Sequence, residues 1–364
     1  MNNETIWSNE LKDFISFSNE FNSVPNWISF NIKNSCVLSV KNEKDFFYYK
    51  NQIKIFNSST FNAYKKIDEN QAFDYCKRCE KINPNDANLL THIAMCFFEG
   101  IGVSSSKKKA FEYYQKAFKI DNTINDVCGY IALCYENGWG TNINKEKAFE
   151  YYRKYIKINK KSSSVWRRLG FFYRNGIGTK KNEAEAFFCY KKSVEIDPTN
   201  SDVWNNLGYY YQNGIGTEKN EAEGFKCRKK AVEINPENYV AWVNLGWCYL
   251  NGIGTEKNET EVFNCYKKAI EIDSNNSYAW NQLGYCHENG IGTEKNETET
   301  FNCYKKAVEL NSNNSTILSN IGYCYLRGIG TEVDKLKAKE LLSKALEIDP
   351  DCEEIKTVLK ECDE

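Results

Sequence analysis

Asn-Gly-Ile-Gly-Thr, residues 213–217, is the stretch of sequence that decides the fold, because it returns at a fixed interval. Its first glycine recurs every 38 residues, seven times in all: Gly100, Gly138, Gly176, Gly214, Gly252, Gly290 and Gly328. The residues of the loop vary, with Glu-Gly-Ile-Gly-Val at residues 99–103 and Asn-Gly-Trp-Gly-Thr at residues 137–141, but the 38-residue interval is constant. A period of about 20 to 50 residues indicates an array of repeated supersecondary structures.

The first half of each repeat predicts a helix, shown most clearly in residues 201–238. Trp204, Leu207, Gly208 and Tyr211 stand at positions i, i+3, i+4 and i+7, which is the spacing of one face of an α-helix. The glycine that follows is expected to end this helix, since helices commonly stop on a glycine in the left-handed conformation. A helix precedes the glycines where a phosphate-binding loop would need a strand, so we interpret the loop as a turn between two helices.

The second half of the repeat predicts another helix with its own start and stop signals. Asn220 precedes Glu223 by three residues, which we interpret as an Asn version of the capping box. The same pair recurs in three further repeats: Asn182 with Glu185, Asn258 with Glu261, and Asn296 with Glu299. Pro198 ends the second helix of the preceding repeat, since proline cannot continue a helix interior. Each repeat is therefore predicted to be a pair of antiparallel helices.

These residues carry a family resemblance. Trp-x-x-Leu-Gly-x-x-Tyr at residues 204–211, with Ala-Phe in the second helix and Glu-Ile-Asp-Pro at residues 195–198, resembles the tetratricopeptide signature. The period is four residues longer than in that family, and Gly-x-Gly followed by Ala-Phe-x-x-Tyr resembles its Sel-1-like branch. The resemblance covers residues 63–364 and implies an all-α fold. That fold is an α-solenoid of antiparallel helix pairs, about seven repeats long, wound into a right-handed superhelix.

Residues 1–62 do not carry the repeat, so we expect an N-terminal extension followed by the repeat solenoid over residues 63–364. Residues 71–82 match the second half of a repeat, which makes residues 48–70 a candidate degenerate unit that caps the array. Three short elements are expected inside the extension, namely two helices and a β-hairpin: Trp7–Phe21, Lys44–Phe56 and Ile28–Val40.

The composition is that of a folded protein with little net charge. Hydrophobic residues make up 41% of the 364 residues, charged residues 27%, and the formal net charge is −1. General nucleic-acid binders carry a basic surface, so we expect no nucleic-acid partner. The first residues show no secretory signal, and no stretch approaches the roughly 18 to 20 apolar residues that span a bilayer. We therefore expect a cytoplasmic protein.

Fifteen cysteines include one set with the spacing of a zinc site. Cys76 and Cys79 form a Cys-x-x-Cys pair, and His92 and Cys96 follow as in Cys-Cys-His-Cys sites. The repeat register gives a simpler interpretation, because Cys96 stands four residues before the loop glycine, where several other repeats also carry cysteine. Buried cysteine packs as a small hydrophobic residue. We expect reduced thiols, no metal and no cofactor, and keep as an alternative a metal- or thiol-dependent enzyme that uses these four residues.

No group of residues predicts catalysis. The only histidines are His92 and His287, and His287 fills a position that other repeats give to a packed tyrosine. Its neighbour Cys286 is not a catalytic partner, since consecutive residues of a helix point about 100° apart. A disulfide across the two helices of a repeat, such as Cys248 with Cys265, stays open. We therefore predict no enzymatic activity.

The resemblance implies a ligand-binding face lined by the first helix of each repeat, at its positions two, five, nine and twelve. Position nine carries large side chains, and five of them form the predicted partner-binding stripe: Phe171, Tyr209, Trp247, Tyr285 and Tyr323. Position five adds Arg167, Asn205 and Asn281, and position twelve adds Arg174. Tyrosine, tryptophan and arginine are enriched in binding hot spots. Arg167 and Arg174 would suit an acidic segment of the partner.

Together, these observations predict a non-enzymatic protein–protein interaction scaffold or adaptor. We expect a peptide or helix of another protein to lie in the concave groove formed by the first helices. A helical-repeat RNA-binding protein is a further alternative, and that class needs varied polar residues at fixed positions of its groove.

Overall fold

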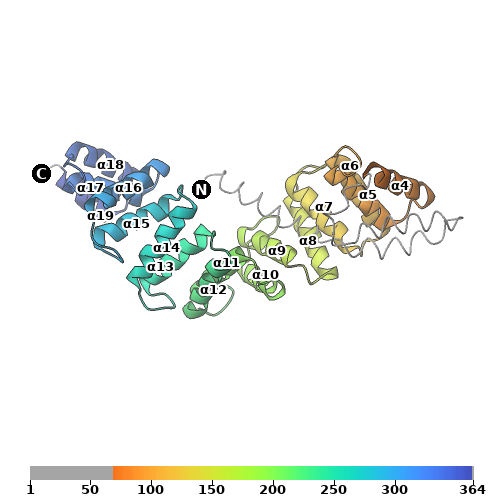
Figure 1. Ribbon diagram of the computed structural model, residues 1–364, viewed down its shortest axis with the longest axis horizontal. Coiled ribbons are helices and arrows are strands. Elements are labelled where there is room, and N and C mark those ends of the chain that lie inside the picture. Colours follow the sequence, from red (N-terminus) through yellow and green to blue (C-terminus); the bar gives the residue numbers. More distant parts are fainter. Residues whose placement is uncertain (1–68, 363–364) are drawn as a thin grey trace. The chain divides into compact units, whose positions relative to one another are not determined.

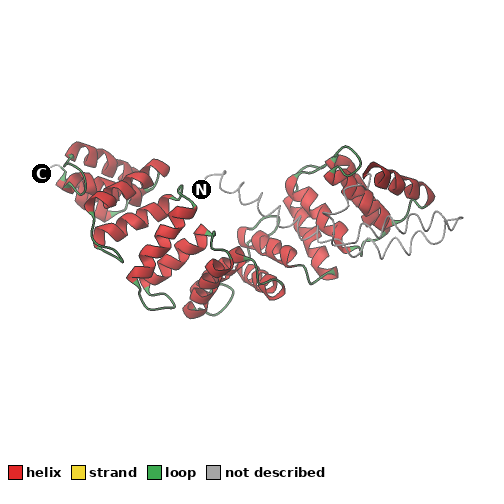
Figure 2. Ribbon diagram, in the orientation of Figure 1, coloured by secondary structure: helices red, strands yellow, loops and turns green. Residues whose placement is uncertain are grey.

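The computed structural model of the chain describes residues 69–362, and every regular element in that range is a helix (Figure 1, Figure 2). The chain divides between Ile196 and Asp197 into two compact units, an N-terminal and a C-terminal unit, each considered by itself. The described helices of the N-terminal unit are α4 (Glu69–Ile82), α5 (Ala87–Glu99), α6 (Lys107–Ile120), α7 (Asn125–Asn137), α8 (Lys145–Ile158), α9 (Ser163–Asn175) and α10 (Glu183–Ile196). Those of the C-terminal unit are α11 (Ser201–Asn213), α12 (Glu221–Ile234), α13 (Tyr239–Asn251), α14 (Glu259–Ile272), α15 (Ser277–Asn289), α16 (Glu297–Leu310), α17 (Ser315–Arg327), α18 (Lys335–Ile348) and α19 (Glu353–Glu361).

The helices alternate as the first and second helix of each repeat. Every first helix from α5 to α17 has 13 residues and every second helix from α4 to α18 has 14. Within each unit, the two helices of a repeat pack on each other, and the second helix then packs on the first helix of the next repeat. Neither helix could bury its apolar face alone, so stacking supplies the core.

Two side-chain bonds fix the start of the first helix. In α11, the side chain of Asn200 accepts a hydrogen bond from the backbone N–H of Val203 at 3.1 Å. The indole Nε1 of Trp204 donates to the carbonyl oxygen of Pro198 at 2.8 Å, six residues earlier. Trp166, Trp242 and Trp280 make the same bond in their repeats. The tryptophan of the signature therefore ties the first helix to the turn that precedes it.

The two loop glycines have different tasks. Gly252 ends α13 in the left-handed conformation with φ +69°. Gly254 also has a positive φ, of +68°, and a Cβ atom there would lie 2.0 Å from the carbonyl oxygen of Glu221, the first residue of α12. The second glycine of the loop thus allows close packing against the second helix of the preceding repeat, in addition to the predicted chain reversal.

The predicted capping box is confirmed in one half and wrong in the other. In α14, the side chain of Asn258 accepts from the backbone N–H of Glu261 at 3.1 Å, as expected of an N-cap. The backbone N–H of Asn258, which the carboxylate should have bound, donates instead to the carbonyl oxygen of Tyr249 at 3.3 Å. The loop returns to the end of its own first helix, so this backbone N–H is not available to the Glu261 carboxylate.

A column of buried tyrosines fills the space between the two helices of most repeats. These tyrosines stand on successive second helices and are at most 1% exposed: Tyr114, Tyr152, Tyr190, Tyr266 and Tyr304. In the repeats that carry the Leu-Gly signature, the ring packs against its glycine. A Cβ atom at Gly170 would lie 2.8 Å from the ring of Tyr190, and one at Gly284 would lie 2.7 Å from the ring of Tyr304. The large ring leaves no room for a Cβ atom at these glycines, whereas the repeats of Tyr114 and Tyr152 have Ala94 and Ala132 at this position.

The predicted all-α solenoid of antiparallel helix pairs is confirmed for the described residues, and α4 coincides with the helix predicted over residues 71–82. The right-handed superhelix stays a prediction. The elements expected within residues 1–62, and the boundary at residue 62, lie outside the described residues. Between residues 69 and 362, no helix combines the length and the apolar character needed to cross a bilayer.

Candidate functional site

The predicted stripe at position nine of the first helices is partly open to solvent. Three of its members are well exposed: Phe171 at 37%, Tyr209 at 41% and Tyr285 at 40%. Trp247 and Tyr323 are half-buried. The equivalent residue of an earlier repeat, Leu133, is only 3% exposed and belongs to the core. Position nine is therefore a surface position in the later repeats and a packing position in an early one.

A hollow of about 270 Å³ in the C-terminal unit opens beside this stripe. Its walls include Tyr209 and Gln212 from α11, Trp247 from α13 and Tyr278 from α15. Arg228 reaches it from the second helix α12. Two predicted partner-binding residues, Tyr209 and Trp247, thus line one hollow together with an arginine that the sequence analysis did not select.

A larger hollow, of about 540 Å³, lies further along the same unit. Tyr249 and Leu250 of α13, Asn281 and Tyr285 of α15, and Asn320 of α17 are among the residues that line it. It contains two more predicted residues, Asn281 and Tyr285. Both hollows are mixed in character, with aromatic walls and a few amide groups, as is common for peptide-binding surfaces.

The asparagines predicted at position five hold neighbouring first helices together. The side-chain amide of Asn244 donates to the side-chain oxygen of Asn205 at 3.0 Å, and that of Asn320 donates to Asn281 at 2.8 Å. Asn281 is only 5% exposed. These bonds join consecutive repeats, so the two asparagines position the walls of the hollows.

The two arginines predicted in the N-terminal unit differ in exposure. Arg167 of α9 is 9% exposed, whereas Arg174 is half-buried. At position twelve of the preceding first helix, Glu136 is buried and accepts a hydrogen bond from the hydroxyl of Tyr152 at 2.6 Å. It also lies 3.5 Å from Nε of Arg168. Position twelve therefore serves an internal polar network in this repeat.

Arg228 occupies the place of a tyrosine in the buried column and is 4% exposed. Its Nη1 donates to the sulfur of Cys248 at 2.7 Å and to the carbonyl oxygen of Asn244 at 3.4 Å. Its guanidinium also lies 5.9 Å from the ring centre of Trp247. Among the ion pairs of residues 69–362, none involves Arg228. A buried cation without a carboxylate strongly favours an incoming anion.

A further polar mismatch lies in the same hollow. Nε of Arg228 and Oε1 of Gln212 are both buried, and within the described residues neither has a hydrogen-bond partner. Buried donors and acceptors are normally satisfied, so an unsatisfied donor beside an unsatisfied acceptor calls for an explanation. An entering carboxylate could accept from Nε of Arg228, and an entering N–H group could donate to Oε1 of Gln212.

Burial keeps several core cysteines of the described residues in the protonated thiol form. Cys248 and Cys265 have free thiols, so no disulfide joins the two helices of their repeat. Burial raises the pKa of Cys265, Cys286 and Cys324 to about 12. A reactive cysteine needs the opposite shift, because the thiolate is the nucleophile.

Among the described residues, no three of Cys76, Cys79, His92 and Cys96 converge as a possible metal site. Cys76 and Cys79 lie on α4, whereas His92 and Cys96 lie on α5. Within the described part of the chain, three potential metal ligands converge at one other place, formed by α15 and α16.

Comparison with known families gives matches to three repeat families. The Sel1 repeat matches residues 90–122, 128–155, 167–196, 277–312 and 318–349, and the tetratricopeptide repeat matches residues 189–222 and 229–260. The protein prenyltransferase alpha subunit repeat matches residues 260–290. The comparison with curated protein sequences gave no match.

Among solved structures, one similar chain is a protective antigen of uropathogenic Escherichia coli strains that displays an SLR fold, with 21% identity and a TM-score of 0.66. The similarity covers 87% of the present chain and 65% of that antigen, so the chain spans less than two thirds of its relative. A Sel1 repeat protein from Oxalobacter formigenes has 22% identity and a TM-score of 0.53, over 66% of this chain and 97% of that one.

These matches agree with the helix pairs, the 38-residue period and the glycine loops described above. The chain is a tetratricopeptide-like Sel1 repeat protein. Repeat proteins of this kind are generally non-enzymatic, and their fold suggests a protein-interaction scaffold.

Arg228 was not predicted as a site residue, although the repeat register contained the signal. Of the second helices from α6 to α16, all except α12 have tyrosine at the position equivalent to Arg228. Aligning that column would have shown one arginine among tyrosines. The hollows were not predictable in this way, because they depend on how far neighbouring helices separate at the surface.

Proposed function

We propose that the chain is a non-enzymatic interaction scaffold that binds a segment of another protein, in the cytoplasm, along the face formed by its first helices. The observation that carries this proposal is the hollow lined by Tyr209, Trp247 and Arg228. It combines exposed aromatic surface with a buried cation, and both are typical of anchoring points in peptide recognition.

The partner segment carries an acidic side chain or a terminal carboxylate that binds Arg228. The free-energy cost of desolvating the guanidinium was already offset when the protein folded. A carboxylate that enters this sheltered site therefore gains a charge-assisted hydrogen bond without that cost. Gln212 supplies an acceptor for an N–H group of the same segment. The anchor therefore recognises a carboxylate next to a backbone or side-chain amide.

The aromatic residues of the stripe supply the apolar part of recognition. Tyr209 and Tyr285 are each about 40% exposed, and burying such rings gives much of the free energy of binding at protein interfaces. Tyr323 extends the same position into a later repeat of the C-terminal unit. We expect apolar residues of the partner to contact these rings on either side of the acidic anchor.

The two alternatives have less support. An enzyme that uses Cys76, Cys79, His92 and Cys96 would need these side chains to converge, and they do not form a group of three potential metal ligands. A helical-repeat RNA-binding protein would need a basic groove, whereas the chain has a net charge of −1.

The proposal can be tested with a random peptide library displayed on phage and selected on the immobilised full-length chain. Enriched peptides are then synthesised, and their affinities are measured by isothermal titration calorimetry. We expect the peptides to share an aspartate, glutamate or free C-terminus beside an apolar residue. Arg228→Tyr restores the residue that other repeats carry, so it should keep the fold and weaken binding about tenfold or more, the equivalent of one charge-assisted hydrogen bond.

Two further variants complete the design. Trp247→Ala removes an aromatic wall and should weaken the same peptides, whereas Leu336→Ala changes an 85% exposed side chain on α18 and should leave their affinity unchanged. Peptides without any acidic preference, or with equal affinity for all three variants and the parent chain, would contradict the assignment of this hollow.

A further inference from the structure

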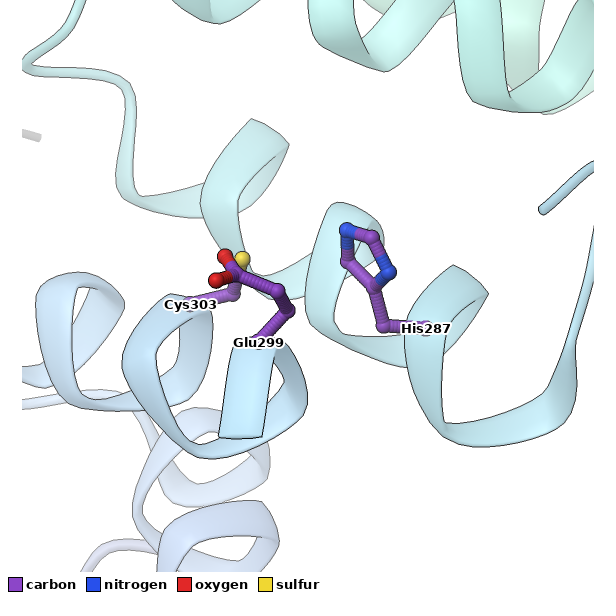
Figure 3. A group of neighbouring side chains, drawn as sticks. All are labelled: His287, Glu299 and Cys303. Carbon is purple, nitrogen blue, oxygen red and sulfur yellow. The ribbon is translucent and has the colours of Figure 1, made fainter. Parts of the chain in front are cut away.

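Three potential metal ligands converge between the two helices of one repeat. His287 lies near the end of α15, while Glu299 and Cys303 lie one turn apart near the start of α16. One ligand atom of each residue can be chosen so that all three lie within 4.8 Å of one another. In Figure 3 the carboxylate and the thiol lie next to each other on one helix, and the imidazole faces them from the neighbouring helix.

The repeat register shows that this set is particular to one repeat. A glutamate four residues before a cysteine recurs on four second helices: Glu185 with Cys189, Glu223 with Cys227, Glu261 with Cys265, and Glu299 with Cys303. The residue that faces the pair from the first helix is tyrosine in the other three repeats and histidine only here. A single exchange of tyrosine for His287 thus adds a third ligand to two that the repeat already provides.

The surroundings favour ligation by all three groups. Burial lowers the pKa of His287, against the opposing effect of the Glu299 carboxylate, so the imidazole stays neutral and keeps a lone pair for a metal. The ring packs edge-on against Phe263 with 5.4 Å between ring centres, which holds its orientation. Nδ1 of His287 is buried, and no described residue forms a hydrogen bond with it. Cys303 is 1% exposed and fixed in the core, whereas Glu299 is exposed and free to rotate.

We propose that His287, Glu299 and Cys303 bind a divalent zinc ion. Nitrogen, sulfur and carboxylate oxygen are the ligand types that zinc takes in proteins, and three protein ligands leave a fourth position for water or a group of a partner. Ligand atoms of a tetrahedral zinc site lie roughly 3.4 to 3.6 Å apart. The ligand atoms lie within 4.8 Å of one another, so they need to close by at most about 1.4 Å on binding.

Binding changes the proton balance at one ligand. Burial raises the pKa of Cys303 to about 12, so its thiol carries a proton before zinc arrives. As the zinc–sulfur bond forms, the S–H bond breaks and the proton leaves to solvent, while the neutral imidazole and the carboxylate have none to lose. Each zinc ion bound should therefore release about one proton near neutral pH.

The test compares zinc binding by the reduced full-length chain with that of His287→Tyr. Tyrosine is what other repeats carry, so this variant should keep the helical spectrum of the parent. We expect the parent to bind one zinc ion more than the variant, or to bind it at least about tenfold more tightly, in competition with a chromogenic chelator. Cobalt(II) should give the parent a thiolate-to-metal charge-transfer band that both His287→Tyr and Cys303→Ser lack.

A second variant tests whether histidine at this position of the repeat is sufficient for zinc binding. Tyr249 faces Glu261 and Cys265 in the preceding repeat, and after desolvation these two groups are the largest causes that raise the pKa of its phenol. Tyr249→His, made in the His287→Tyr background, should restore one zinc ion and the cobalt band. Equal zinc binding by the parent and His287→Tyr, or a cobalt band that survives Cys303→Ser, would overturn the proposal by pointing to other cysteines.

Discussion

At the scale of the residue, one position of the repeat shows how a single side chain changes the chemistry of its surroundings. The buried tyrosines of the second helices face position twelve of the first helix of the same repeat. Where that position is glutamate, the phenol has a partner: Tyr152 donates to Glu136 at 2.6 Å and Tyr304 donates to Glu288 at 2.7 Å. In the first complete repeat, position twelve is a phenylalanine, and Tyr114 has no hydrogen-bond partner among the described residues.

This difference predicts opposite effects of the same substitution. Tyr152→Phe leaves the buried Glu136 without its hydroxyl donor and should lower the free energy of unfolding by about 1 to 3 kcal/mol. Tyr114→Phe removes a buried hydroxyl that lacks a partner, so it should be neutral within about 0.5 kcal/mol or slightly stabilising. Urea denaturation followed by circular dichroism gives both values. Equal losses in the two variants would mean that ring packing alone decides the stability of this column.

The predicted partner-binding residues also occupy one position in successive repeats. The sequence predicted the position-nine stripe from the family resemblance, and the structure places Tyr209, Trp247 and Tyr285 at hollows. It could not predict that Leu133 is buried, because that depends on how tightly successive first helices pack. Arg228 and His287 were not predicted as binding residues, because other repeats have a packed tyrosine at the same positions.

At the scale of the element, the glycine loop shows what a local pattern can predict and what it cannot. The helix stop at the first glycine follows from local chemistry and is confirmed by positive φ values throughout the array. The close approach of the second glycine to the preceding repeat depends on how the repeats stack. The bond from the backbone N–H of the capping asparagine to the glutamate carboxylate is absent because that N–H binds the end of the first helix. Local start and stop signals are therefore reliable in this chain, whereas contacts between repeats had to come from the structure.

The two loop glycines should respond differently to alanine. Both have φ near +70°, so each substitution costs about 1 kcal/mol of left-handed strain. At Gly252 the nearest atom to a new Cβ is the flexible side chain of Lys257, at 3.2 Å. At Gly254 it is the backbone oxygen of Glu221, at 2.0 Å, and only separation of the repeats relieves that clash.

We therefore expect Gly254→Ala to lower the free energy of unfolding by at least about 2 kcal/mol more than Gly252→Ala. Chemical denaturation of the two variants side by side checks this difference. Similar losses would show that the loop relaxes without disturbing the preceding helix, and that the second glycine serves chain reversal alone.

At the scale of the whole molecule, the C-terminal unit has several small clusters of buried residues, whereas in the N-terminal unit one cluster runs from α5 to α10. In the C-terminal unit, one cluster of buried residues joins α16, α17, α18 and α19, and others lie further back along the chain. The stability of such an array is approximately a sum of each repeat and its contacts with its neighbours. A change at one place should therefore weaken the nearest repeats and leave distant ones as they were.

Removal of residues 351–364 tests this locality. The truncation deletes α19, whose Ile355 is 4% exposed and packs in the same cluster as Leu341, Leu342 and Ala345 of α18. Without α19 these side chains meet water, and α18 should open more often. We expect amide hydrogen exchange in α17 and α18 to accelerate at least about tenfold, which corresponds to about 1.4 kcal/mol, while exchange in α5 to α10 stays at its original rate. A uniform acceleration over all helices would instead mean that the array unfolds as one cooperative body. The nearest-neighbour description would then fail for this chain.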